Sequence, residues 1–423
     1  MRQLAERYGT PLYVYQLAEV RAAAAALRAA VPEEARLFYS LKANPHPAVV
    51  GELVRAGLSS EVSSTAELAA ALTAGQSPAD CIMTGPGKTV AEVDDALIRG
   101  VRTFSLESEV DYARLADSAR RHAMTADILL RLNAGSAAGR GTGLRMTGAA
   151  TQFGMPVRTA LDIIEQARGG GPLTPIGLHL FPATNLQTEA DLLAEFTLSI
   201  DTAANLLYRA RLSAGLVDIG GGFAAPFARP GARADYSGLR ERLGGVLDER
   251  LPGWRSGQPR VAFESGRYLT ATCGTLLTTV LDVKTSGGIT YVVLDAGVNA
   301  LGGMSGLGRI LAPSVQPAGG PATGRAPNGG NRISLVGTLC TPLDVLSRSA
   351  DIEVPRIGDV LEIPNVGAYG VTASLMGFLS KPVPAEVVVE RDGSVVGARR
   401  LKLLEVNLDP DGADRPARNT ALV

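Results

Sequence analysis

The chain has 423 residues, of which 46% are hydrophobic and 20% charged, and its formal net charge is −1. This length exceeds what one ordinary compact core holds, so we expect two domains, and the near-neutral charge gives no electrostatic reason to expect nucleic acid or an anionic membrane as a partner. No apolar run approaches the roughly 20 residues that span a bilayer, and the first residues lack the layout of a secretion signal, so we expect a cytoplasmic protein.

The first half of the chain repeats a short apolar run followed by a segment with helical periodicity. Eight such runs alternating with helices predict an α/β fold, a (β/α)8 barrel. We place this barrel at residues 1–267, with a helix at residues 17–31 leading into it. The eight runs are residues 37–43, 58–63, 81–86, 103–108, 128–133, 176–181, 216–222 and 261–266.

The alternation of strand-like and helical segments stops after residue 268, where strand-like runs follow one another without helices between them. Residues 276–284 and 290–296 flank a Thr-Ser-Gly-Gly turn, which is typical of a hairpin. We therefore predict a mainly antiparallel β domain at residues 268–423. The Pro- and Gly-rich residues 313–331 predict a mobile loop, and the tail after residue 407 a frayed end. Further strand candidates are residues 333–339, 360–363, 386–390 and 395–399.

Lysine is scarce, with five lysines against 36 arginines. A lysine retained in such a chain can have a task that arginine cannot perform, because only an amine can lose its proton and condense with an aldehyde. Lys284 and Lys402 lie in polar or terminal settings and need no such explanation. The three cysteines are too far apart for metal-ligand spacing or a disulfide framework, so no metal site is expected.

Reactive residue types follow the apolar runs, at the strand ends where barrels of this type carry their active sites. Lys42, His179 and Glu264 end the first, sixth and eighth runs. Three consecutive glycines follow the seventh run, and Gly266-Arg267 follows the eighth. A Gly-rich turn lets backbone N–H groups approach a phosphate, and an arginine adds charge. Each feature alone has an ordinary structural explanation, but together they predict a phosphate-anchored ligand among the three side chains.

The same residues carry a family resemblance. The order Tyr-x-Leu-Lys-Ala-Asn around Lys42, His179, the Gly-Gly-Gly turn, Glu-x-Gly-Arg from Glu264, Cys340 and Gly-Ala-Tyr ending at Tyr369 resembles the fold-type III pyridoxal-phosphate (PLP) decarboxylases. That family includes the diaminopimelate and the ornithine/arginine decarboxylases. The resemblance covers nearly the whole chain and implies a PLP-binding barrel of the alanine-racemase type.

The resemblance also implies roles. Lys42 would form the Schiff base with PLP, His179 would stack on the pyridine ring, and Glu264 would bond to the ring nitrogen and keep it protonated. Cys340 matches the cysteine that reaches the site from the partner subunit of a homodimer with shared active sites, where it reprotonates Cα after carbon dioxide leaves. The residues expected to hold the phosphate are Gly220, Gly221, Gly222, Gly266, Arg267 and Tyr369.

The substrate end departs from the family pattern. Thr341 follows Cys340, where diaminopimelate and ornithine decarboxylases carry a Glu or an Asp that binds a distal ammonium. Arg309 is the nearest counterpart of the arginine that binds a distal carboxylate, and Glu61 stands where the family usually has Asp. Residues 340–344 and 378–382 resemble a natural-product subgroup that decarboxylates amino acids tethered to an acyl carrier protein or conjugated to citrate. Candidate substrate-binding residues are Thr341, Asp344 and Arg309.

Three other functions stay open. The enzyme could decarboxylate free diaminopimelate or a basic amino acid. It could be an alanine-racemase-like enzyme, although such enzymes place an arginine against the ring nitrogen and this chain places Glu264. It could be an inactive regulator that mimics a decarboxylase, although such proteins usually lose the lysine or the cysteine, and this chain retains Lys42 and Cys340.

Overall fold

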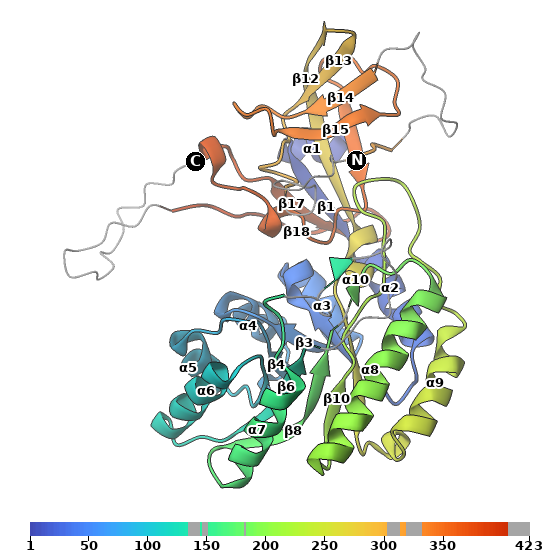
Figure 1. The fold of residues 1–423 in the computed structure, drawn as a ribbon. Helices are drawn as coiled ribbons and strands as arrows, with labels where there is room; N and C mark the ends of the chain where they lie inside the picture. Colours follow the sequence, from blue (N-terminus) through green and yellow to red (C-terminus); the bar gives the residue numbers. More distant parts are fainter. Residues whose placement is uncertain (134–143, 146–150, 182, 303–313, 319–331, 405–423) are drawn as a thin grey trace, which may run out of the picture. The chain divides into compact units, whose positions relative to one another are not determined.

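A computed structural model of the chain describes residues 1–133, 144–145, 151–181, 183–302, 314–318 and 332–404. These residues form two compact units (Figure 1), which we describe separately. The barrel unit comprises residues 20–225 and 233–270, and the sheet unit comprises residues 1–19, 226–232 and 271–423.

The barrel unit contains a closed barrel of eight parallel strands, which confirms the predicted fold. Each predicted apolar run overlaps one of these strands. The strands are β2 (Arg36–Ser40), β3 (Ser59–Val62), β4 (Cys81–Met83), β5 (Thr103–Leu106), β6 (Ala126–Leu132), β8 (Leu173–Leu180), β10 (Leu216–Asp218) and β11 (Arg260–Ser265).

The interior of the barrel is filled by apolar side chains. Phe38, Ile82, Leu129 and Leu216 come from alternate strands and belong to one buried cluster with Ala262. Such layers are characteristic of (β/α)8 barrels, which are packed cores and not open pores. Because the strands are buried on both faces, they read in the sequence as continuous apolar runs.

Helices alternate with the strands of the barrel unit (Figure 1). Several begin at a side-chain cap directly after a strand: Ser64 accepts from the Glu67 N–H, and Ser108 accepts from the Asp111 N–H. Such caps satisfy backbone donors that the first helical turn leaves open. No helix in the described part of the chain combines the length and apolarity needed to cross a membrane. The helices are α2 (Leu17–Ala30), α3 (Pro47–Arg55), α4 (Thr65–Thr73), α5 (Val90–Ile98), α6 (Glu109–Arg121), α7 (Val157–Arg168), α8 (Glu189–Ala210), α9 (Leu239–Arg250) and α10 (Arg267–Thr270).

The sheet unit is built on one eight-stranded sheet with strand order β15-β14-β13-β12-β1-β17-β18, and β16 also pairs with β12. Most neighbours are antiparallel, as predicted; β1 with β17 and β13 with β14 are parallel. The predicted hairpin turns at Gly287-Gly288, both at positive φ. Its elements are α1 (Arg2–Tyr8), β1 (Leu12–Gln16), β12 (Gly274–Ser286), β13 (Ile289–Leu294), β14 (Arg332–Val336), β15 (Val345–Ala350), β16 (Val360–Pro364), β17 (Ala385–Val389) and β18 (Val395–Arg400).

The boundary between the units differs from the predicted division at residues 267 and 268. Residues 1–19 belong to the sheet unit because β1 pairs with β12 and β17, and its Leu12 and Val14 lie in that unit's apolar core. No strand is predicted from the sequence at β1 or at β15. Most of the predicted loop 313–331 and the tail after residue 407 lie outside the described residues; within the loop, Ser314 bridges to Ser347 of β15.

Candidate active site

Lys42 lies in a short 3-10 helix, Leu41–Ala43, directly after β2. Its Nζ is 3.0 Å and 3.2 Å from the two carboxylate oxygens of Glu61 on β3. The Lys42 side chain is 44% exposed, whereas that of Glu61 is 2% exposed. The amine is therefore accessible to a ligand, and the buried Glu61 carboxylate fixes its position.

The Glu61 carboxylate is kept ionised by its partners. Burial alone raises the pKa of Glu61, but the charge of Lys42 and hydrogen bonds from Ser40, Thr84 and Lys42 outweigh burial and hold the pKa at about 2. Thr84 donates to Glu61 at 2.5 Å. The acid thus remains a carboxylate throughout the neutral range.

This pair leads to a stability prediction for the cofactor-free protein. Because the pKa of Glu61 in the folded state lies below its ordinary value of 4.5, Glu61 contributes stability above about pH 4.5, and that contribution is lost as pH falls through about 2. Lys42→Met leaves a buried carboxylate without its cation. We expect a loss of about 1–2 kcal/mol at pH 7, less than for a fully buried pair because solvent screens Lys42.

The matched control is Lys42→Arg, which keeps the positive charge. Thermal unfolding of the two cofactor-free variants, measured between pH 2 and pH 8, should show the destabilisation in Lys42→Met and a smaller one in Lys42→Arg. Equal unfolding midpoints at pH 7 would show that Glu61 gains nothing from the charge.

His179, Asp218 and Glu264 form a buried cluster at the ends of β8, β10 and β11, and one ligand atom of each lies within 4.8 Å of the others. His179 Nε2 is 3.2 Å from Glu264 Oε1, and both side chains are almost fully buried. No described residue hydrogen-bonds His179 Nε2, Glu264 Oε1 or Asp218 Oδ2. Burial, with the charge of Glu264 in second place, raises the pKa of Asp218 well above its ordinary range. Orphaned buried polar atoms of this kind indicate a place where a ligand's polar atom belongs.

The Gly-rich turn after β10 can accept no side chain. A Cβ on Gly220 would lie 2.2 Å from the Leu180 carbonyl oxygen, and one on Gly221 would lie 2.7 Å from the Glu264 carbonyl oxygen. Gly266 is similarly close to Ala43, which follows Lys42. The predicted phosphate loops thus pack on the strand ends that carry His179 and Glu264, and their backbone can approach a ligand closely.

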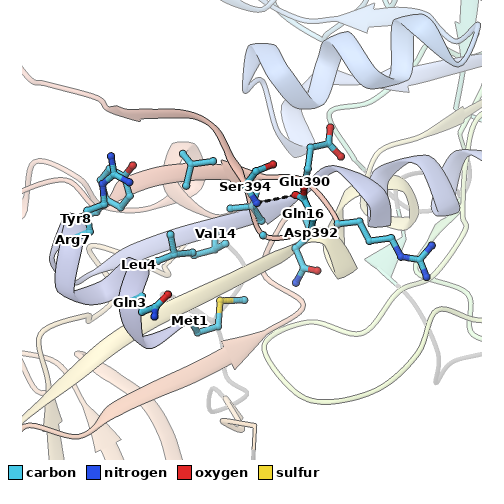
Figure 2. A pocket seen from close by; sticks show the side chains of 14 residues that line it. Met1, Gln3, Leu4, Arg7, Tyr8, Val14, Gln16, Glu390, Asp392 and Ser394 are labelled. Atoms are coloured by element: carbon cyan, nitrogen blue, oxygen red, sulfur yellow. Dashed lines mark hydrogen bonds between the residues drawn. The ribbon is translucent and has the colours of Figure 1, made fainter.

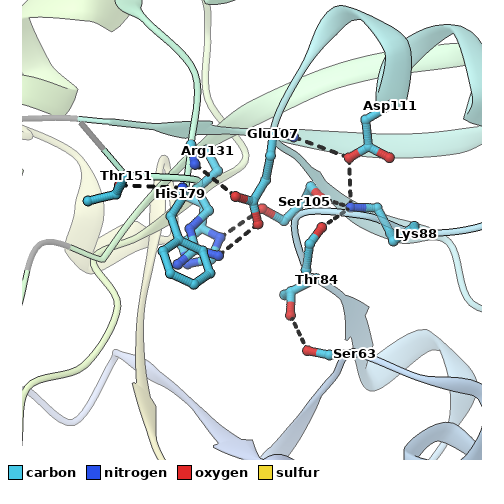
Figure 3. Close-up of polar contacts among 12 residues, drawn as sticks. Ser63, Thr84, Lys88, Ser105, Glu107, Asp111, Arg131, Thr151 and His179 are labelled. Carbon is cyan, nitrogen blue, oxygen red and sulfur yellow. Dashed lines mark hydrogen bonds and ion pairs between the residues drawn. The ribbon is translucent and has the colours of Figure 1, made fainter. Parts of the chain in front are cut away.

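Two buried ion pairs near this cluster were missed by the sequence analysis (Figure 3). Arg131 donates to Glu107 at 2.8 Å, and Lys88 lies 2.7 Å from Asp111, with the Lys88 side chain 1% exposed. The Glu107 carboxylate also accepts from the Gly154 N–H at 2.7 Å. These pairings cannot be predicted from a single sequence, because the two partners of each pair come from different strands and loops.

Among the other predicted residues, buried Arg267 begins α10 of the barrel unit, whereas Cys340, Thr341, Asp344 and Tyr369 belong to the sheet unit. Cys340 is exposed, and Thr341 follows it in the turn before β15. Asp344 is buried and accepts from the Val298 N–H at 2.8 Å and the Leu339 N–H at 2.7 Å. Each of its oxygens thus accepts from a backbone N–H group, and a role of Asp344 in substrate binding stays a prediction. Tyr369 has a positive φ of 56°, and Arg309 lies outside the described residues.

A separate groove of about 860 Å³ lies in the sheet unit, between α1, β1 and the β17–β18 turn (Figure 2). Buried Val14 and Val389 form part of its wall, and exposed Arg7, Arg391 and Asp392 line it. It contains none of the predicted site residues. Its exposed side chains carry both signs of charge, so the groove selects no ligand chemistry.

Comparison with known proteins identifies the family. Residues 17–271 match the family model of the pyridoxal-dependent decarboxylases, in its pyridoxal-binding domain. The chain is 30% identical over 404 residues to an L-glutamyl-[BtrI acyl-carrier protein] decarboxylase of Niallia circulans, covering 94% of this chain and 92% of that protein. It is also 30% identical over 402 residues to a diaminopimelate decarboxylase of Methanothermobacter thermautotrophicus, covering 93% and 89%.

Solved structures agree on the fold. A diaminopimelate decarboxylase from Helicobacter pylori complexed with L-lysine aligns with a TM-score of 0.78 at 22% identity, over 95% of this chain and 96% of that chain. One from M. jannaschii aligns with a TM-score of 0.79 at 22% identity, over 94% and 91%.

The chain belongs to the pyridoxal-dependent decarboxylases: it is a PLP-dependent amino-acid decarboxylase, a carbon–carbon lyase. The barrel unit fits this cofactor. Glu264 Oε1, which lies 3.2 Å from His179 Nε2 but makes no hydrogen bond to a described residue, could accept from a protonated ring nitrogen, and the glycine turn leaves backbone room for a phosphate.

Proposed function

We propose that this enzyme decarboxylates an amino acid whose far end is conjugated, and that the conjugate is an acyl carrier protein or a similar acyl group in a natural-product pathway. The observation that carries the proposal is Thr341 beside Cys340, where a distal ammonium would need a carboxylate. The similarity to a relative named as a decarboxylase of carrier-bound L-glutamate supports it.

In this proposal the barrel residues hold the cofactor. Lys42 would bind it covalently, Glu264 would accept a hydrogen bond from its ring nitrogen, and His179 would lie against its ring. When bound, PLP supplies an electron sink for the bond that breaks between Cα and the carboxylate. Ionised Glu264 keeps the ring nitrogen protonated and so preserves that capacity. The glycine turn, Gly266, Arg267 and Tyr369 would hold the phosphate.

The proposal includes a homodimer in which Cys340 acts on the partner's cofactor. Cys340 is exposed, while Cys81 and Cys273 are buried. A thiol at the tip of a surface turn is accessible to a second chain. There it can donate a proton to Cα after carbon dioxide leaves.

Thr341 offers a hydroxyl in place of a charge. Its Oγ1 accepts from the Leu343 N–H at 3.3 Å, inside the same turn. An unpaired distal ammonium would lose a charge-assisted hydrogen bond of about 1.5–3 kcal/mol, or roughly tenfold to a hundredfold in binding. An acylated far end carries no ammonium and loses nothing there.

The test compares carbon dioxide release from free and conjugated amino acids. We expect free diaminopimelate, lysine and ornithine to react at least about tenfold more slowly, in kcat/KM, than a glutamyl-carrier or citryl-diamino-acid conjugate. Thr341→Glu should not improve the conjugate reaction and should raise activity on free basic amino acids. Thr341→Gln, the neutral isostere, is its control and should bring no such gain.

The rival function is decarboxylation of free diaminopimelate. The diaminopimelate decarboxylase of Methanothermobacter thermautotrophicus is 30% identical to this chain, the same identity as the carrier-protein decarboxylase. The same panel separates the two. Efficient turnover of free diaminopimelate by the unmodified enzyme, without any gain from conjugates, would refute the proposed substrate class.

A further inference from the structure

A buried chain of polar contacts leads from Lys88 to His179, and the roles proposed above do not use it (Figure 3). Lys88 Nζ lies 2.7 Å from Asp111 Oδ2 and donates to the carbonyl oxygens of Gly85 and Ser105, each at 2.8 Å. The three protons of the ammonium thus have three acceptors. Because a charged donor forms a strong hydrogen bond, the Ser105 peptide is held firmly on β5.

Ser105 in turn holds one edge of the His179 ring. Its side chain is fully buried, and its Oγ is 2.7 Å from His179 Nδ1. The other ring nitrogen, Nε2, is 3.2 Å from Glu264 Oε1. One nitrogen therefore meets a hydroxyl, which can donate or accept, and the other meets a carboxylate, which can only accept when ionised.

The charged neighbours of His179 decide which tautomer this arrangement favours. Glu264 and Asp218 bring carboxylates within 4.8 Å of a ring nitrogen, and Arg131 on neighbouring β6 is paired with Glu107. With the proton on Nδ1, a neutral ring would leave the Nε2 lone pair beside the Glu264 carboxylate. With the proton on Nε2, the positive end of the N–H dipole lies near Glu264 Oε1, at 3.2 Å and without hydrogen-bond geometry, and Nδ1 accepts from Ser105. The second arrangement is electrostatically favoured.

We propose that Ser105, its peptide fixed by the Lys88–Asp111 pair, is a positioning residue that holds the His179 ring with Nδ1 as the acceptor of the Ser105 hydroxyl and with the proton on Nε2. The inference rests on the proposed contact between His179 and the cofactor ring. The positive end of an N–H dipole beside Glu264 favours a carboxylate there, and a carboxylate is the form that would hold a protonated ring nitrogen.

The direct test is magic-angle-spinning NMR of the holoenzyme labelled with [15N]histidine. The chain has three histidines, His46, His122 and His179, and His179→Gln assigns the signal. His46 is an internal reference, because its Nδ1 accepts from the Ala48 N–H at 3.2 Å. We expect His179 to show a protonated Nε2 and an unprotonated, hydrogen-bonded Nδ1. A proton on Nδ1 of His179 in the wild-type holoenzyme would overturn the proposal, and no substituted protein needs to fold for that result.

A set of serine variants tests the consequence by titrating PLP into the cofactor-free protein. Ser105→Ala should release Nδ1, give a detectable Nδ1–H signal and weaken PLP binding about two- to tenfold, the value of one hydrogen bond. Ser105→Thr keeps the hydroxyl and should restore both. The matched control is Ser60→Ala, since Ser60 is equally buried, on β3, and donates to Gln76 at 3.0 Å.

Two failures are distinguishable. If Ser105→Ala and Ser60→Ala change PLP affinity equally and the His179 spectrum stays that of the wild type, Ser105 has only a packing role and the inference fails. If His179→Gln leaves PLP affinity unchanged while the wild-type tautomer is as expected, the proposed contact of His179 with the cofactor is what fails.

Discussion

Lys42→Ala is expected to lower decarboxylase activity by about three orders of magnitude or more, a loss typical of deleting a covalent catalytic group. Lys42 follows a barrel strand, its side chain is 44% exposed, and its amine is held by a buried carboxylate. Borohydride treatment of the wild-type holoenzyme should attach the cofactor permanently, and peptide mass spectrometry should find it on Lys42.

The other lysines provide the controls. The Lys88 side chain is 1% exposed, and its ammonium has three acceptors around it. The Lys88 amine is therefore inaccessible to a cofactor. The Lys284 side chain is 65% exposed and lies on the β12–β13 hairpin of the sheet unit, and Lys284→Ala should retain full activity. Reductive labelling of Lys88 or Lys381 in place of Lys42 would overturn the assignment.

The barrel was predictable because its signal is local. Parallel strands buried on both faces read as apolar runs, and all eight runs overlap the expected strand. The polar residues that end these runs stand out against them, so Lys42, His179 and Glu264 could be selected from sequence alone. The structure places all three at strand ends of one barrel.

The features that could not be predicted from the sequence depend on contacts with residues far along the chain. β1 is a strand because it pairs with β12 and β17, more than 250 residues away. Asp344 reads as a polar residue near Cys340, but its carboxylate turns inward to backbone N–H groups of Val298 and Leu339. Ser105 gains its significance only from the His179 and Lys88 contacts, which no spacing rule predicts.

Subunit complementation tests the proposed role of Cys340. Cys340→Ala alone is expected to lower kcat about a hundredfold to ten-thousandfold, the range for a positioned proton donor. If each active site combines Lys42 of one chain with Cys340 of the other, a mixed dimer of the two single variants has one site with both residues intact and one with neither. After random exchange, half of the dimers are mixed, so about a quarter of wild-type activity should return.

Each control mixes two chains that are substituted at the same residue. Mixing Lys42→Ala with Lys42→Arg, or Cys340→Ala with Cys340→Ser, creates no intact site and should restore nothing. The mixed fraction is verified by native mass spectrometry of chains with different tags, so that absence of exchange is not mistaken for absence of complementation. An active monomer, or verified mixed dimers without recovered activity, would refute a shared site. Cys340 would then be an exposed thiol of its own turn, and the proton donor would have to come from the same chain as Lys42.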